Sequence, residues 1–184
     1  MINLSLQYII PYKFHNKTYP VFTFVETLFF AWFFYHILEK ISLKKKVRII
    51  TMLFSAGLLI YYYYTYYVLA LRLQLDSVPI GVETILIFLF SFFYFFEQMN
   101  DTTSLFIYSK PSFWAVLGIL LYLSGSFFIY IFANQISAKE LAKYWVITNI
   151  ASIVKNLLFV IALYIQANQY LKKPPRNYKL YPSN

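Results

Sequence analysis

Five stretches of the chain are continuously apolar and about as long as the 20 or so helical residues that cross a membrane. They run over residues 19–38, 49–71, 80–96, 113–133 and 145–167. They lack the alternation of apolar and polar positions that a membrane-spanning strand shows, and a helix satisfies its own backbone inside lipid. The pattern therefore predicts an all-α fold, a polytopic transmembrane helix bundle with about five membrane-spanning helices.

The segments outside these stretches set the predicted organisation. Residues 2–10 are apolar but too short to span, so we interpret residues 1–18 as an interfacial N-terminal stub, with a remnant of a further helix as the alternative. Residues 19–171 form the predicted bundle. Residues 172–184 are basic and rich in proline, which predicts a disordered cytoplasmic tail.

Composition supports a membrane location and excludes several chemistries. Of 184 residues 60% are hydrophobic and 12% charged, whereas about a quarter of the residues of a soluble domain are charged. The absence of cysteine and the presence of two histidines remove disulfides, thiolate sites and most imidazole-ligated centres. We expect no metal site and no cofactor.

The net charge of +9 is distributed unevenly along the chain. Ten of the sixteen Lys and Arg residues fall in the connections after the first and third stretches and in the tail, and five fall on the other side. Because basic residues are enriched on the cytoplasmic side, the N-terminus is predicted outside and the C-terminus in the cytoplasm. The predicted location is the inner (cytoplasmic) membrane of a bacterium.

Two basic clusters lie next to predicted membrane surfaces, where each basic residue contributes about 1 kcal/mol of attraction to anionic lipid. The predicted anionic-lipid contacts are Lys44, Lys45, Lys46, Arg48, Lys172, Lys173 and Arg176. Short basic segments between apolar runs favour the lipid bilayer and its anionic headgroups as the partner over nucleic acid. A membrane or cytoplasmic protein partner, and an oligomer, stay open as alternatives.

Three ionisable residues fall inside the predicted spans, where a charge costs about 2.5 to 3.5 kcal/mol. Counted from the outer helix ends, Glu83 lies about 5 Å deep, Glu26 about 10 Å and Lys155 about 15 Å. A flexible lysine stem bridges such a gap. We predict a pair of Glu26 with Lys155, and Glu83 as the substitute partner.

The fifth stretch carries a polar stripe within an arc of about 120°. The candidate intramembrane polar cluster is Glu26, Glu83, Asn149, Ser152, Lys155 and Asn156. In the third stretch Thr84, Ser91 and Gln98 share one edge, and in the fourth Gly118 and Gly125 share a face suited to close helix approach. The cluster either holds the bundle together, senses a ligand or an ion, or forms an ion path.

Catalysis has one weak candidate. Ser124 and His36 are similar to the serine and histidine of an intramembrane protease, but Tyr122 stands where a Gly-x-Ser-x-Gly elbow needs a glycine. We therefore assign no catalytic residue and expect a protein that is not an enzyme.

Several short motifs accompany the predicted helices. They are Tyr19-Pro20 ahead of the helix with Glu26, Pro111-Ser-Phe-Trp114, Tyr122-Leu-Ser-Gly125 and Ile153-Val-Lys-Asn156. From residue 19 to about 167 the chain resembles a group of uncharacterised bacterial multi-pass integral membrane proteins of about five helices. The resemblance implies a compact helical bundle without an attached enzymatic domain.

These features favour a non-enzymatic sensory, regulatory or scaffolding component of the membrane. The alternative is a small transporter or ion channel that uses the intramembrane Glu and Lys cluster. Three ionisable groups are few for a proton relay, and an odd helix count is atypical of transporters built from two equal halves.

Overall fold

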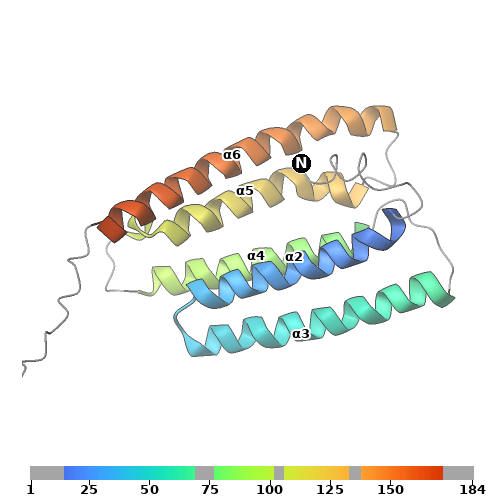
Figure 1. Ribbon diagram of the computed structural model, residues 1–184, viewed down its shortest axis with the longest axis horizontal. Coiled ribbons are helices and arrows are strands. Elements are labelled where there is room, and N and C mark those ends of the chain that lie inside the picture. The colour runs from blue at the N-terminus through green and yellow to red at the C-terminus, as the bar shows by residue number, and fades with distance from the viewer. Residues whose placement is uncertain (1–14, 69–76, 102–105, 133–137, 172–184) are drawn as a thin grey trace, which may run out of the picture.

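A computed structural model describes residues 15–68, 77–101, 106–132 and 138–171 (Figure 1). The elements in these ranges are all helical, which confirms the predicted helix bundle. They are α2 (His15–Ile37), α3 (Ile41–Tyr63), the π-helical turn η2 (Tyr64–Val68), α4 (Ser77–Met99), the 3₁₀ turn η3 (Ile107–Ser109), α5 (Pro111–Phe132) and α6 (Ala138–Leu171). Most of the predicted stub and the whole predicted tail, with Lys172, Lys173 and Arg176, lie outside the described residues.

Three of the five helices are long and apolar enough to cross a membrane, counted over the described residues. These stretches are Val78–Met99, Pro111–Ile129 and Lys143–Leu171. The apolar part of α2 is shorter, Val21–Ile37, and α3 carries a basic cluster in its first two turns. The apolar helices support a membrane location.

Helix α3 corrects the prediction of a long basic connection before residue 49. It begins at Ile41, so three residues join it to α2, and Lys44, Lys45, Lys46 and Arg48 lie on the helix itself. Lysine and arginine are good helix formers, and their long stems let the charges reach water from a helix end. Leu43 and Val47 are buried between them and fix this turn against the bundle.

The five helices alternate in direction, so one end of the bundle collects the ends of α2, α4 and α6 and the starts of α3 and α5 (Figure 1). We call this the basic end, because the cluster at the start of α3 lies there. Helix α6 packs along α5, α5 packs on α4, and α4 and α3 pack on α2. The core lies around Phe34, Phe90 and Tyr94, and the Tyr94 hydroxyl lies 2.8 Å from Ser112 Oγ, which links α4 to α5.

Two glycines allow α5 and α6 to approach closely, as their shared face predicts. A Cβ atom at Gly125 would lie 2.8 Å from the Cβ of Ala151. At Gly118 it would lie 3.3 Å from the backbone oxygen of Lys155 and from the Leu158 side chain. The absence of side chains here sets how near α6 lies to α5, and therefore where Lys155 projects.

Candidate functional site

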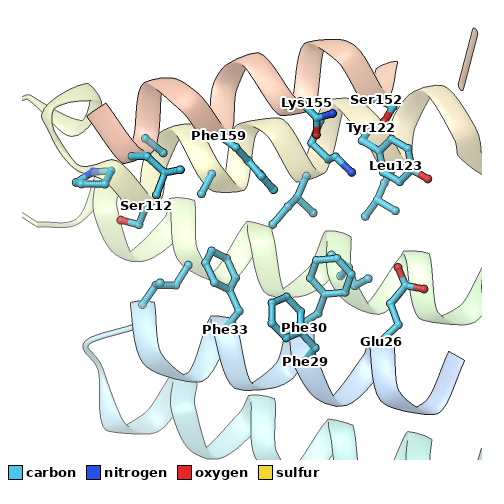
Figure 2. A pocket seen from close by; sticks show the side chains of 18 of the residues that line it. Glu26, Phe29, Phe30, Phe33, Ser112, Tyr122, Leu123, Ser152, Lys155 and Phe159 are labelled. Atoms are coloured by element: carbon cyan, nitrogen blue, oxygen red, sulfur yellow. The ribbon is translucent and has the colours of Figure 1, made fainter. Parts of the chain in front are cut away.

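The candidate site is a pocket of about 1270 Å³ formed by α2, α4, α5 and α6 (Figure 2). Helices α2 and α6 form its side walls, and α4 and α5, which pack on each other between them, form its floor. Val25 and Phe29 on α2 and Leu163 on α6 line the pocket and are also exposed, so it opens along the side of the bundle. We call it the groove. Pockets for drug-sized ligands measure about 300–1,000 Å³, so the groove is large enough for a bulkier molecule.

The three predicted intramembrane charges all line this groove, each from a different helix. Figure 2 shows Glu26 on α2 and Lys155 on α6 pointing into it from facing walls. The predicted direct pair does not form, because the ion pairs within 4.0 Å among the described residues all involve Lys110. Helices α4 and α5 lie between α2 and α6 and hold the two charges apart. Lys155 and Glu26 still interact electrostatically across the groove.

Glu83 is the carboxylate with a local partner. It is 5% exposed, and the Thr27 hydroxyl on α2 donates to its Oε1 at 2.8 Å. This bond ties α4 to α2 at the depth of the charges. The Glu26 carboxylate, by contrast, has no hydrogen bond or ion pair to another described residue.

Lys155 rests on aromatic rings. Its Nζ lies 4.3 Å from the centroid of the Tyr122 ring on α5 and 6.0 Å from that of Phe159 on its own helix. Such cation–π contacts contribute about 0.5 to 2 kcal/mol, which offsets part of the cost of a half-buried ammonium. Among the described residues it donates no hydrogen bond, so its N–H donors stay available to the groove.

The remaining members of the predicted cluster divide between groove and surface. Ser152 is buried and lines the groove, and Asn156 lines it while staying exposed. Asn149 is exposed and is not among the lining residues, so the structure does not bring it to the other five.

The groove is divided along its length. The half away from the basic end holds a polar section, made of Thr23, Glu26, Glu83, Thr84, Ser152 and Lys155. Closer to the basic end lies an apolar section, made of Phe30, Phe33, Ile87, Ile119, Phe159 and Ala162, and beyond it Ser112, Gln166 and Gln169 also line the groove. Figure 2 shows Phe33 and Phe159 facing one another in the apolar section. The arrangement suits a molecule with one polar and one apolar end.

A second set of charges, which sequence reasoning missed, lies at the basic end. Glu97 on α4 is 3% exposed, and its carboxylate accepts the backbone N–H groups of Glu39 at 2.8 Å and Lys40 at 2.5 Å. Lys110 donates to Gln98 Oε1 at 2.6 Å and to Asp101 at 3.1 Å, and lies 3.8 Å from Glu39. The available signal was the Glu97-Gln98 step that ends an otherwise apolar helix.

The predicted lipid-contact residues on α3 gather around aromatic rings near this end. Arg48 donates to the Tyr35 hydroxyl at 2.9 Å, and the Lys44 ammonium lies 5.4 Å from the same ring. Lys46 lies 5.9 Å from the Phe93 ring. Lys45, Lys46 and Arg48 are exposed, and contact with anionic lipid stays a prediction.

The weak catalytic candidates lie on different helices. The Ser124 hydroxyl on α5 donates to the Leu120 carbonyl of its own helix at 2.7 Å. His36 on α2 lies 2.8 Å from the Trp32 carbonyl and against the Trp32 ring. Over the described residues there is no group of three His, Asp or Glu side chains that would hold a metal ion.

Comparison with known proteins gives no match to a family model, a curated protein or a solved structure.

Proposed function

We propose that this protein is a non-enzymatic, multi-pass integral membrane protein with a sensory role, which binds an amphiphilic ligand in the groove. The observation that carries the proposal is the placement of an acid, Glu26, and a base, Lys155, on facing walls of an open groove. A charge at this depth in a membrane is costly and marks a functional site by default. Among the described residues neither side chain has an ion-pair partner within 4.0 Å, so both face the groove and can contact a ligand.

The surface of the helices supports integration into a bilayer. Helix α6 exposes large apolar side chains over most of its length, among them Ile150, Ile153, Leu157 and Val160. A soluble monomer rarely exposes so continuous an apolar surface. We propose further that the basic end faces the cytoplasm of a bacterial cell, with the N-terminus outside, since basic residues favour the cytoplasmic side.

Binding accounts for the groove better than conduction does. An ion path needs polar groups along its whole length, whereas here apolar side chains, among them Phe33 and Phe159, separate the polar section from Ser112, Gln166 and Gln169 near the basic end. The transporter or channel alternative predicts ion or solute flux in liposomes that Glu26→Gln together with Lys155→Met removes. The proposed sensory protein produces no such flux in either form.

The fold offers a path from the groove to the basic end. The floor helices α4 and α5 continue from the groove to the Lys110 bonds, and α2 ends at the turn held by Glu97. A ligand that bridges α2 and α6 changes the spacing of helices that meet at this end. We propose that a partner on the cytoplasmic side recognises this change in helix spacing.

Paired spin labels test whether the groove responds to a ligand. The chain has no cysteine, so Val25→Cys with Leu163→Cys places labels solely on the two rims. We expect the inter-label distance distribution to narrow when a total lipid extract is added to protein in maltoside detergent, because a bound molecule bridges the walls. The control pair Leu121→Cys with Val160→Cys reports the closely packed α5 and α6 and should not change. A rim distance that is the same with and without lipid contradicts the proposal.

A further inference from the structure

We propose that the ligand is a single-chain zwitterionic amphiphile, with its cationic group at Glu26, its anionic group at Lys155 and its chain along the apolar section. This inference rests on the proposed function, because it names the ligand of the same groove. It is carried by three observations: opposite charges on facing walls, their lack of mutual contact, and the division of the groove into two sections.

The polar section is complementary to a zwitterion rather than to a single charge. A purely anionic ligand at Lys155 leaves the Glu26 carboxylate without a partner, and a purely cationic ligand at Glu26 does the same to Lys155. A buried or half-buried charge left without a partner costs more than a bonded one contributes. Glu83 already accepts a hydrogen bond from Thr27, so it competes less for the ligand.

Donors and rings in the polar section fit the two poles. The Lys155 ammonium lies over the Tyr122 ring, 4.3 Å from its centroid, and the Ser152 hydroxyl lies one turn away on the same wall. An anionic group there gains charge-assisted hydrogen bonds. On the opposite wall Phe29 and Phe30 lie one helical turn from Glu26, on the side of the apolar section, and aromatic faces attract quaternary ammonium groups.

The apolar section fixes the direction of the chain. From Lys155 to Gln166 near the basic end, α6 rises about 16 Å. Between them the groove is lined by Phe33, Ile119 and Phe159, which offer a chain the apolar surroundings that it has in lipid. The ligand therefore lies with its headgroup in the polar section and its chain toward the basic end.

Native mass spectrometry with four matched amphiphiles tests this inference. Full-length protein is kept in dodecyl maltoside, which serves as the uncharged amphiphile. It is mixed with equal low concentrations of dodecylphosphocholine, dodecyltrimethylammonium and dodecyl phosphate, and the adducts that the protein retains are counted. The chain is the same in all four, so differences report the headgroup. We expect the protein to retain dodecylphosphocholine at least about tenfold over dodecyltrimethylammonium and over dodecyl phosphate, because each of those carries charge of one sign and loses one charge-assisted contact.

Two charge variants assign the poles. Glu26→Gln should lose the preference for dodecylphosphocholine over dodecyl phosphate, and Lys155→Met should lose the preference over dodecyltrimethylammonium. Glu39→Gln and Lys143→Met change the same residue types at exposed positions outside the groove and should keep the wild-type pattern. If a variant does not fold, the preference of the wild-type protein for dodecylphosphocholine still tests the inference.

The outcomes separate the inference from the proposed function. If charged and uncharged amphiphiles are retained equally, and Ala115→Phe, which fills the groove, removes this retention, the zwitterion inference is overturned. The proposed function stands in that case, because the groove still binds the alkyl chain. Ser124→Phe is the control, because Ser124 is exposed and does not line the groove. If the amphiphiles are retained by Ala115→Phe as well as by Ser124→Phe, they bind outside the groove, and both the zwitterion inference and the proposed function are overturned. Preference for the purely cationic or the purely anionic amphiphile also overturns the inference.

Discussion

The basic end and the groove use the same kinds of charged residue in opposite ways. At the basic end Glu97 is bonded to the backbone of the connection between α2 and α3, and Lys110 to side chains at the end of α4 and just after it, at 2.5 to 3.1 Å. In the groove, Glu26 and Lys155 face each other without an ion pair, although this region is the more costly place for a charge. The contrast separates charges that hold the helices together from charges that are kept for something outside the chain.

The two regions also differ in what positions them. The basic end depends on bonds between residues far apart in sequence, such as Glu39 and Glu97, which are 58 positions apart. The walls of the groove depend on packing, with Gly118 and Gly125 setting the approach of α6 to α5. Substitutions at the basic end and in the packing should therefore lower stability, whereas substitutions of the groove charges should not.

The largest effect is expected at Glu97. Glu97→Ala removes the acceptor of two backbone N–H groups in a nearly fully buried place, and we expect the free energy of unfolding to fall by about 3 kcal/mol. Denaturation of the detergent-solubilised protein with sodium dodecyl sulfate, followed by circular dichroism, measures the loss.

A graded series identifies the cause of this loss. Glu97→Gln keeps one acceptor oxygen, so its free energy of unfolding should lie between those of Glu97→Ala and the wild type. Glu39→Gln, whose side chain is 72% exposed, should change stability by less than about 0.5 kcal/mol. Equal losses for Glu97→Ala and Glu39→Gln would show that the buried bonds do not hold the turn between α2 and α3.

The next largest effect is expected at Gly125. A Cβ atom there would lie 2.8 Å from that of Ala151, so Gly125→Ala forces α5 and α6 apart and should cost about 2 kcal/mol. Adding Ala151→Gly removes the clash and should restore most of the stability. Gly57→Ala is the matched control, because nothing lies within 4 Å of the added atom, and it should be neutral or stabilising. A destabilised double variant would contradict the close approach of the two helices.

Lys110 is expected to have a smaller effect. Lys110→Met removes donors to Gln98 and Asp101 at a position where the side chain is 25% exposed, and we expect a loss of about 1 kcal/mol. The same denaturation assay measures it, and a parallel series in high salt separates screened ion pairs from the bond to Gln98. An unchanged stability would remove Lys110 from the set of residues that hold the basic end together.

The helices and their polar faces could be predicted from sequence because both are local properties. Continuous apolar stretches give the five helices, and periodicity places Ser91 and Gln98 on a buried edge and Gly118 and Gly125 on a packed one. Shared depth and periodicity also brought Glu26, Glu83 and Lys155 to one groove.

The predictions that were wrong or missing concern features that depend on residues far apart in the sequence. Hydropathy counts the basic run at Lys44 as a loop, although lysines at a helix end keep helical backbone and reach water through their stems. Nothing near Glu97 in sequence shows that it binds the backbone after α2. The gap between Glu26 and Lys155 follows from the two helices that lie between their walls, which no depth estimate along a single helix contains.

The smallest effect on the free energy of unfolding is expected in the groove, where it contrasts most with the effect at the basic end. Glu26→Gln with Lys155→Met breaks no hydrogen bond or ion pair among the described residues and removes two charges from a poorly solvated place. The lost cation–π contact at Tyr122 opposes that gain, so the free energy of unfolding should stay within about 0.5 kcal/mol of the wild type. The same assay measures it beside Lys110→Met. A loss comparable to that of Glu97→Ala would show that the charges hold the bundle together, and the groove would then have no need of a ligand to explain them.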